Sequence, residues 1–256
     1  GQQRVPDDFV RDHRIDLPAK EEQRRIADFL DAETARIDLV AARRREMREL
    51  LALKRDRIIE EKLGVGGNRP STHCIPLKYL AAEITVGIVI TPAKWYVETG
   101  GVHALRGVNV KPGRISTDDL IQISAEGHAE HRKSRLQAGD VVVVRTGQAG
   151  AAAVVPREFE GANCIDLILI RPGPKLAPKY VEYVLNSGYA RRQIAEHSVG
   201  SIQAHFNVGS MKQLPFPVLS RNEQERVAEA LNEQLGALDT LADRLMKQEL
   251  LLAERR

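Results

Sequence analysis

The stretch Glu22-Gln23-Arg24-Arg25-Ile26-Ala27 recurs 201 residues later as Glu223-Gln224-Glu225-Arg226-Val227-Ala228. The match continues at the same offset at Leu30/Leu231, Ile37-Asp38/Leu238-Asp239, Ala41/Ala242, Arg43/Arg244 and Leu50-Leu51-Ala52/Leu251-Leu252-Ala253. Two unrelated charged helices would not keep register for so long. We therefore infer that one ancestral helix occurs twice in the chain.

Each copy of the repeat alternates apolar spacings of four and three, which is the pattern of a coiled-coil seam. The predicted seam residues are Ile26, Leu30, Ile37, Val40, Met47, Leu51 and Ile58 in the first copy and Val227, Leu231, Leu238, Leu241, Leu245 and Leu252 in the second. At about 1.5 Å per residue, residues 21–63 span on the order of 65 Å. A helix of that length needs a partner along it.

The order of the two helices predicts how they pair. The segment between them leaves the end of the first helix and enters the start of the second, so helices that pack together must be antiparallel with a globular domain at one tip. Glycine and proline in residues 64–70 mark the exit from the first helix. Ser220 is expected to cap the second. We predict a first helix over residues 21–66, a globular domain over 67–219 and a second helix over 220–256.

Residues 1–20 are predicted to be the tail of a preceding domain or a linker. Their end, Ile15-Asp16-Leu17-Pro18, echoes Phe216-Pro217-Val218-Leu219 at the offset of the repeat. A chain cut at both ends and a chain that works as a dimer both fit this echo.

The segment between the helices is rich in predicted strands. Residues 140–145 and 151–155 are expected to be buried strands joined by a turn at 146–150. A further strand is expected over 163–171, and helical spacing runs from Lys179 to about His197. The predicted fold class is mixed α/β: one globular domain of largely antiparallel strands plus helices, at the tip of a long antiparallel two-helix coiled coil.

Charge is concentrated in the central segment. The chain has a net charge of +3, but residues 68–219 hold 17 basic and 12 acidic side chains and six of the seven histidines. This distribution is expected of a surface that faces phosphates, although a solvated surface explains it equally. No apolar run of membrane-spanning length and no signal-peptide pattern is present, so the expected location is the cytoplasm. Cys74 and Cys164 cannot form a disulfide framework, and no metal site is predicted.

Several of these stretches together resemble type I restriction-modification specificity subunits. The resemblance rests on the repeated helix, on residues 105–110 (Leu-Arg-Gly-Val-Asn-Val), on 139–142 (Gly-Asp-Val-Val) and on 200–209 (Gly-Ser-Ile-Gln-Ala-His-Phe-Asn-Val-Gly). The family's pattern has two target-recognition domains held apart by two conserved helices, and this sequence holds one such domain. A half-subunit and a truncated form remain open.

The resemblance implies a non-catalytic subunit that recognises a bipartite double-stranded DNA site. The implied partners are methyltransferase (modification) subunits and an ATP-dependent nuclease (restriction) subunit, with a homodimer as an alternative arrangement and no membrane. S-adenosylmethionine, ATP and Mg²⁺ are expected in those partner subunits and no cofactor in this chain. In keeping with this, no methyltransferase Asn-Pro-Pro-aromatic motif and no Walker lysine occurs.

Base edges are read by arginine or lysine at guanine and by asparagine or glutamine at adenine, while other cations hold phosphates. The candidate DNA-binding residues are Arg106, Asn109, Lys111, Arg114, Arg132, Lys133, Arg135, Arg145, Gln148, Gln203, His205, Asn207 and Lys212. For any one of them, a solvated surface position or a turn-stabilising amide is an alternative explanation.

Two other classes of protein also fit the sequence. One is the specificity region of a fused restriction-methylation enzyme, for which a methyltransferase motif upstream would decide. The other is a coiled-coil scaffold whose inserted domain binds protein, for which an absence of DNA affinity would decide.

Overall fold

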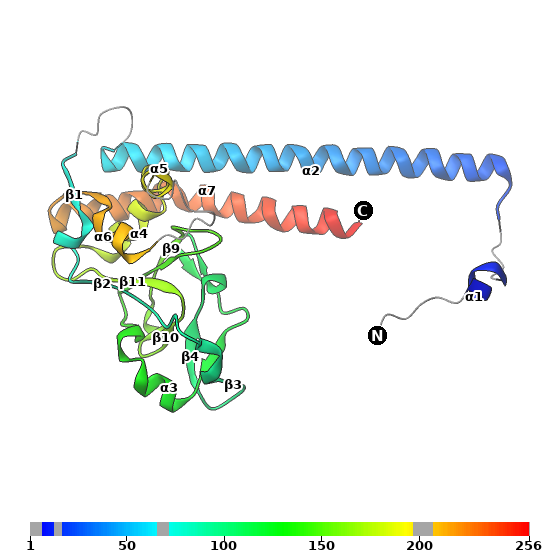
Figure 1. Ribbon diagram of the computed structural model, residues 1–256. Helices are drawn as coiled ribbons and strands as arrows, with labels where there is room; N and C mark the ends of the chain where they lie inside the picture. The colour runs from blue at the N-terminus through cyan, green and yellow to red at the C-terminus, as the bar shows by residue number, and fades with distance from the viewer. Residues whose placement is uncertain (1–6, 13–16, 66–71, 197–206, 256) are drawn as a thin grey trace. The chain divides into compact units, whose positions relative to one another are not determined.

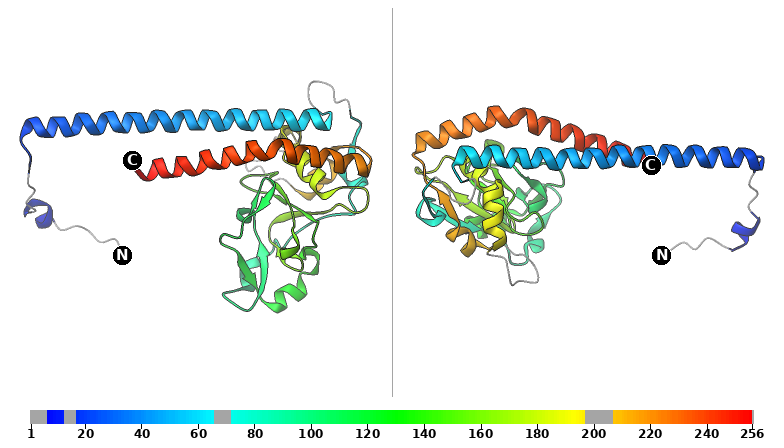
Figure 2. Two further views of the ribbon diagram at one scale, coloured as in Figure 1. Left: turned by 180° about the vertical axis from the view of Figure 1, so that it is seen from behind. Right: turned by 90° about the horizontal axis from the view of Figure 1, so that it is seen from above.

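The computed structural model describes residues 7–12, 17–65, 72–196 and 207–255. It forms two compact units, one of residues 52–239 and one in which residues 1–51 associate with 240–256. Two long helices, α2 (Lys20–Leu63) and α7 (Arg221–Arg255), each contribute to both units. Figures 1 and 2 show each of them as a continuous helix. A short helix, α1 (Asp7–Asp12), precedes them.

Local sequence signals define the ends of the long helices. Gly64, at φ 64°, follows the last residue of α2 in the left-handed conformation that glycine adopts without steric cost. At the start of α7, the Ser220 backbone N–H donates to a Glu223 carboxylate oxygen at 2.9 Å, and the Glu223 N–H reaches the Ser220 hydroxyl at 3.4 Å. This reciprocal pair is a capping box. The Ser220 contacts lower the pKa of the Glu223 carboxyl group.

The two helices are antiparallel. In the unit of residues 1–51 and 240–256, Arg48 pairs with Glu249 and Arg44 Nη1 donates to the Gln248 carbonyl at 3.3 Å. In the unit of residues 52–239, Arg55 Nε lies 3.1 Å from Asp239 Oδ1. Arg55 follows Arg48 in α2, whereas Asp239 precedes Glu249 in α7, so the helices run in opposite directions.

The covered stripe of α7 differs from the predicted seam at alternate positions. Leu231, Leu235 and Leu245 are buried, and Leu238 and Leu252 are half-buried. Predicted Leu241 is 41% exposed, while its neighbour Ala242 is half-buried. Val227 is partly buried and packs on the core next to buried Ala228. The covered residues therefore keep the alternating spacing of four and three. At every second position, the covered residue is the one that follows the predicted residue.

The same one-residue move occurs in α2. Val40 and Met47 are exposed, while Ala41 and Arg48, their following neighbours, are half-buried. Ile26 and Leu30 are 46% and 56% exposed. The predicted residues that do lie on the covered stripe are Ile37, Leu51 and Ile58. An apolar pattern with spacings of three and four is compatible with two neighbouring stripes along a helix. The stripe that is covered here includes Ala41 and Arg48, which are short or charged, so the apolar pattern did not indicate it.

Twelve short strands are described between the long helices. One four-stranded antiparallel sheet has the order β2 (Glu83–Val86), β11 (Leu167–Arg171), β8 (Val141–Val144), β9 (Ala152–Val154). A second has the order β10 (Asn163–Cys164), β4 (Val102–Leu105), β7 (Ile121–Ile123), β3 (Tyr96–Val97), with β10 and β4 parallel. Two antiparallel pairs are β1 (Cys74–Pro76) with β12 (Pro215–Pro217), and β5 (Val110–Lys111) with β6 (Arg114–Ile115).

Short helices complete the domain. They are α3 (Ala125–Glu130), α4 (Pro178–Leu185), α5 (Gly188–Glu196), α6 (Val208–Gln213) and the 3-10 turns η1 (Leu77–Tyr79), η2 (Pro92–Trp95), η3 (Gly107–Asn109), η4 (Arg132–Ser134) and η5 (Arg157–Phe159). In Figure 1, α4, α5 and α6 lie between the first sheet and the adjoining ends of α2 and α7. The predicted mixed α/β class is confirmed.

The first sheet is buried on both faces, which explains the continuous apolar run of β8. Val141 and Val143 join the core cluster that includes α4 and the adjoining ends of α2 and α7, while Val142 and Val144 join the cluster beneath the sheet. Alternation of side chains along a strand produces this division. The predicted hairpin of 140–155 is confirmed by the pairing of β8 with β9.

Two predicted elements are each divided. The strand expected over 163–171 breaks at Asp166, at φ 51°, into β10 and β11, which belong to different sheets. The helix expected from Lys179 breaks at Asn186-Ser187 into α4 and α5. The Asn186 side chain there accepts from the Ala152 N–H at 3.0 Å and donates to the Ala152 carbonyl at 2.8 Å. The Asn186 amide thus makes the pair of hydrogen bonds to Ala152 that a neighbouring strand would make at this edge of β9.

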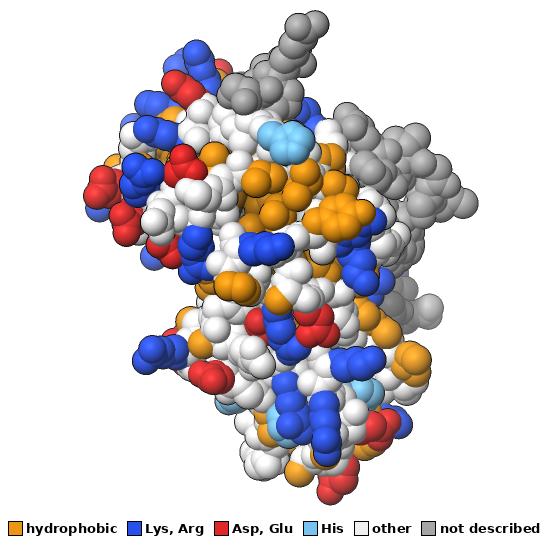
Figure 3. All heavy atoms as spheres, turned by 90° about the vertical axis from the view of Figure 1, so that its left-hand side faces the viewer, with side chains coloured by type: hydrophobic (Ala, Val, Ile, Leu, Met, Phe, Trp, Pro, Cys, Tyr) orange, Lys and Arg blue, Asp and Glu red, His pale blue; other side chains and the backbone are white. Residues whose placement is uncertain are grey.

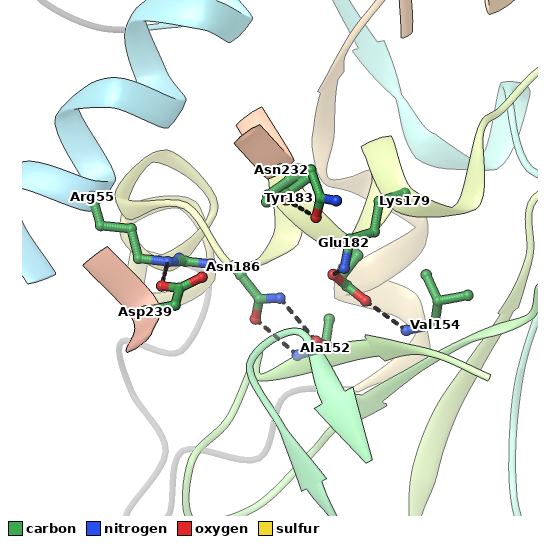
Figure 4. A network of polar contacts seen from close by, with 9 residues as sticks. All are labelled: Arg55, Ala152, Val154, Lys179, Glu182, Tyr183, Asn186, Asn232 and Asp239. Atoms are coloured by element: carbon green, nitrogen blue, oxygen red, sulfur yellow. Dashed lines mark hydrogen bonds and ion pairs between the residues drawn. The ribbon is translucent and has the colours of Figure 1, made fainter. Parts of the chain in front are cut away.

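A polar network fixes α4 between the sheet and α7 (Figure 4). Glu182 accepts from the Val154 N–H at 2.8 Å and pairs with Lys179, and Tyr183 donates to Asn232 Oδ1 at 3.2 Å. Burial raises the pKa of the Tyr183 hydroxyl to about 12, so it remains a donor at neutral pH. The helices and the sheet domain of residues 52–239 thus share one hydrogen-bonded core.

Candidate nucleic-acid interface

Arg145 lies at one end of the first sheet, directly after β8. Its Nη1 is 2.5 Å from Asp166 Oδ1, and its side chain is 19% exposed. Asp166 directly precedes β11 and donates its backbone N–H to the Ile88 carbonyl at 3.0 Å. The ion pair therefore holds Arg145 where the end of β8, the start of β11 and the residues after β2 meet. Asp166 takes up part of the hydrogen-bonding capacity of the Arg145 guanidinium.

Arg106 and Gln148 lie at the same end. The Ile165 N–H donates to the Leu105 carbonyl at 2.8 Å, which places Arg106, the residue after β4, beside the Asp166 turn. Arg106 Nη2 donates to the Asp119 carbonyl at 2.7 Å. Gln148 lies in the exposed β8–β9 turn, and among the described residues its one hydrogen bond is from the Ala151 N–H to its backbone carbonyl, at 3.0 Å. Its side-chain amide is therefore presented to solvent.

Arg132 and Lys133 are exposed on η4, beside the outer edge of β2. An open groove of about 420 Å³ separates residues 86–90 from residues 129–134 and has both cations in its wall. On the face drawn in Figure 3, Lys and Arg side chains lie both at the upper left and, with His side chains, in the lower part, with Asp and Glu side chains among them. Residues 86–90, which form the other wall of the groove, also contact the turn of the Arg145–Asp166 ion pair, because the Asp166 N–H donates to the Ile88 carbonyl.

A buried amide holds the cationic wall of the groove. Asn163, fully buried in β10, donates to the Ser134 hydroxyl at 2.7 Å and to the His131 carbonyl at 3.3 Å. Its oxygen lies 2.6 Å from His128 Nδ1. Because all three partners belong to residues 128–134, one side chain orients α3 and η4 on the second sheet.

Three candidate residues are occupied in holding the fold. Asn109 is fully buried, accepts from the Arg106 N–H at 2.9 Å and donates to the Asp118 carbonyl at 2.7 Å. Arg135 donates to the His128 carbonyl at 2.9 Å. Asn207 caps α6 by accepting from the Ser210 N–H at 2.9 Å. We leave these three residues out of the proposed interface because Asn109 is buried, Arg135 holds the end of α3 and the Asn207 oxygen caps α6.

The other candidates lie elsewhere. Lys111 and Arg114 flank the β5–β6 turn, which lies against edge strand β9 through a Gly113 N–H bond to the Ala152 carbonyl at 2.9 Å. Since β9 and β2 are opposite edges of the first sheet, this turn is across the sheet from the groove. Lys212 is exposed on α6. Gln203 and His205 lie outside the described residues.

The motif at 139–142 has a structural explanation. Asp140 is 3% exposed and accepts from the Gln137 N–H at 2.9 Å, with Arg171 Nε at 3.6 Å. Burial raises the pKa of this carboxyl group, and the Gln137 hydrogen bond and Arg171 oppose that shift. Asp140 therefore orders the entry to β8 at the end of the sheet opposite Arg145.

Sequence reasoning missed the loop that forms the other wall of the groove. Val89 and Ile90 are 47% and 77% exposed although they continue an apolar run from Ile84. The only signal was Thr91-Pro92, which ends that run. Among the described residues, no group of three or more His, Cys, Asp or Glu side chains could hold a metal ion. Nor is any described helix long and apolar enough to cross a membrane.

A domain of two small sheets thus lies between two copies of one helix and bears cations at one sheet end. Curated relatives of the chain are type I specificity subunits. The chain is 26% identical over 159 residues to the StySPI type I specificity subunit of Salmonella potsdam, covering 59% of this chain and 33% of that subunit. It is 21% identical over 256 aligned positions to the EcoBI specificity subunit of Escherichia coli, covering 91% and 53%.

Solved structures share this fold. A chain from work on complex assembly and conformational transition of the type I restriction-modification system matches with a TM-score of 0.64 at 20% identity, covering 93% of this chain and 57% of that one. The HsdS subunit of Thermoanaerobacter tengcongensis matches with 0.55 at 19% identity, covering 93% and 59%. No protein-family model matches. The chain is thus related to type I specificity subunits, as its repeat and the stretches at 105–110, 139–142 and 200–209 together indicated, and spans a third to about half of those curated relatives.

Proposed function

We propose that this chain is a sequence-specific DNA-recognition subunit of a type I restriction-modification complex. The observation that carries the proposal is the recognition-domain fold inserted between two copies of one helix, in a chain related to specificity subunits. Sequence would be read at the end of the first sheet by Arg106, Arg145 and Gln148, with Arg132 and Lys133 on phosphates.

The dimensions of the sheet suit a short stretch of duplex. Four strands about 4.8 Å apart extend roughly 14 Å from β2 to β9. Base pairs rise about 3.4 Å each, so this sheet end would face about four of them. A contact of about four base pairs would cover one part of a divided site.

A bipartite site requires a second recognition domain, and the start of α2 offers a place for one. Gln224 of α7 donates to the Leu219 carbonyl at 2.9 Å and to the Lys175 carbonyl at 3.0 Å, and accepts from the Ala177 N–H at 2.8 Å. Its repeat equivalent, Gln23, makes the corresponding local bond to the Pro18 carbonyl at 2.8 Å.

The apolar residues repeat this contrast. Leu231 is fully buried in the domain core, whereas its equivalent Leu30 is 56% exposed. The start of α2 thus presents the residues with which α7 holds its domain. We propose that a second such domain, from a longer chain or from a second copy, docks there. Sedimentation of the full chain and of Leu30→Asp would test the second-copy form, which predicts a wild-type dimer and a monomeric variant.

The catalytic steps would belong to partner subunits. In this proposal, methyltransferase and ATP-dependent nuclease subunits bind S-adenosylmethionine, ATP and Mg²⁺ and carry out the reactions that use them. The present chain directs these subunits to DNA in the cytoplasm. Two other functions stay as alternatives: the specificity region of a fused enzyme and a protein-binding scaffold.

The test is selection from a random duplex DNA pool by the full chain, alone and with its methyltransferase subunit. An enriched split motif supports bipartite recognition, and a single short motif supports recognition by one domain. Retention of no sequence in either condition contradicts the recognition role and favours the scaffold.

A further inference from the structure

The loop that follows β2 projects an apolar side chain into solvent. Ile90 is 77% exposed, the largest exposure of any large apolar side chain described in residues 52–239. Val89 beside it is 47% exposed. Exposure of these two apolar side chains has a hydration cost, which contact with a ligand would relieve.

The backbone of this loop is fixed rather than loose. At its base, the Ile88 N–H donates to the Cys164 carbonyl at 2.9 Å, and a Cβ on Gly87 would lie 2.3 Å from that carbonyl oxygen. At its far side, Thr91 has φ 44° and ψ 50°, a left-handed conformation that is strained for a β-branched residue. Pro92 follows and restricts the chain further. The projection of Ile90 is therefore built into the loop.

Cations lie on the opposite wall of the groove from the projecting side chain. Arg132 and Lys133 line that wall. Lys94, four residues after Ile90, holds its ammonium 4.1 Å from the centroid of the Trp95 ring in η2, and that ring packs edge-on against His131 of the same wall. Glu130 also lines the groove and carries the opposite charge. An apolar projection next to cations matches a duplex, in which a base step lies next to a phosphate backbone.

We propose that Ile90 is an apolar wedge that enters a base step of the bound DNA while Arg132, Lys133 and Lys94 hold the adjacent phosphates. This assignment rests on the proposed DNA-recognition function and adds to it a second way in which the protein would recognise DNA sequence. The wedge would select steps that unstack easily, so sequence would be recognised partly through deformability as well as through hydrogen bonds.

The test uses the duplex selected by the wild-type chain, with 2-aminopurine placed at each step in turn. Binding of wild-type protein is expected to raise the fluorescence at one step, because unstacking relieves quenching. Ile90→Ala is expected to abolish that rise and to weaken binding roughly tenfold. Leu53→Ala removes a side chain 65% exposed on α2 and is the matched control, with no change in either signal.

Glu130→Gln provides an independent check of the position of the DNA, because loss of its charge is expected to strengthen binding if a phosphate lies near the groove. Unchanged fluorescence and affinity in Ile90→Ala would overturn the wedge while leaving DNA recognition intact. Failure of the wild-type chain to retain any duplex would overturn the recognition function, and the wedge with it.

Discussion

Arg48 of α2 pairs with Glu249 of α7, and these two residues occupy equivalent positions of the repeat, 201 residues apart. In an antiparallel pair of equivalent helices, a residue meets its own counterpart only where a two-fold axis crosses the pair. The internal repeat therefore has a geometric consequence: it makes the helix pair pseudo-symmetric about the Arg48–Glu249 contact.

The ion pair should stabilise this part of the helix pair measurably but modestly. Arg48 is 40% and Glu249 17% exposed, so solvent screens the attraction. We expect a coupling energy of about 0.5 kcal/mol in a double-mutant cycle of Arg48→Ala and Glu249→Ala, measured by urea unfolding. The charge-reversed double variant should recover most of the loss seen in each reversed single variant. Strictly additive single effects would argue against the contact.

Loss of the Asn163 amide should loosen the cationic wall of the groove. Asn163→Ala leaves His128 Nδ1 without its partner, and loss of a buried partner costs roughly 1–3 kcal/mol. It also removes the amide that donates to the Ser134 hydroxyl, which keeps its bond to the His131 carbonyl. The free energy of unfolding should fall accordingly, and hydrogen exchange should accelerate in residues 125–135. Asn207→Ala, which removes only an exposed helix cap, is the control and should cost about 1 kcal/mol. Equal effects of the two variants would contradict the bracing role of Asn163.

Cys164 should be inert while the domain is folded. Burial raises the pKa of its thiol to about 12, so almost none of the reactive thiolate exists at pH 8. In a Cys74→Ala chain, Ellman's reagent should react only after denaturant unfolds the domain. Rapid reaction of the native Cys74→Ala chain would contradict the described packing of β10.

The same shift gives a pH dependence. The folded pKa of Cys164 lies above that of an unfolded cysteine, near 8.5. The thiol therefore lowers stability only above about pH 8.5, where the unfolded chain releases its proton and the folded chain does not. Cys164→Ala should flatten the decline of the unfolding free energy between about pH 8.5 and 12.

Substitutions of Gln148 and of Lys133 should affect DNA binding in different ways. Gln148→Ala is expected to change which base is preferred at one position, because its exposed amide suits an adenine edge. Lys133→Ala should weaken binding to all sequences alike and reduce the salt dependence of affinity by about one phosphate contact. Binding of each variant to the selected duplex and its single-base variants, over a range of salt, distinguishes the two. Uniform weakening by both would contradict the division of roles.

The sequence predicted the elements that depend on local pattern. The two helices, the 140–155 hairpin and the Ser220 cap follow from periodicity and capping chemistry, and the structure has them. The breaks at Asp166 and Asn186 depend instead on partners distant in sequence, Ile88 and Ala152. No local pattern announces such contacts.

The residue types of the candidate site could be predicted from the sequence, but which of those residues lie together at the surface could not. Charge and side-chain type singled out Arg132, Lys133, Arg145 and Gln148 without indicating that Asn109 is buried. Burial of a polar side chain depends on the whole fold, and Asn109 and Gln148 are alike as residue types. Ile90 escaped notice for the reverse reason, because an apolar residue in an apolar run is expected to be buried.

The most direct test of the central claim is methylation mapping. The full chain and its cognate methyltransferase subunit would be expressed in a host without DNA modification, and the methylated positions sequenced across the genome. If the chain directs the methyltransferase, methylation is expected at one defined motif that disappears without this chain and shifts at a single base in Gln148→Ala. Methylation unchanged by removal of the chain, or no methylation at any defined motif in its presence, would contradict it.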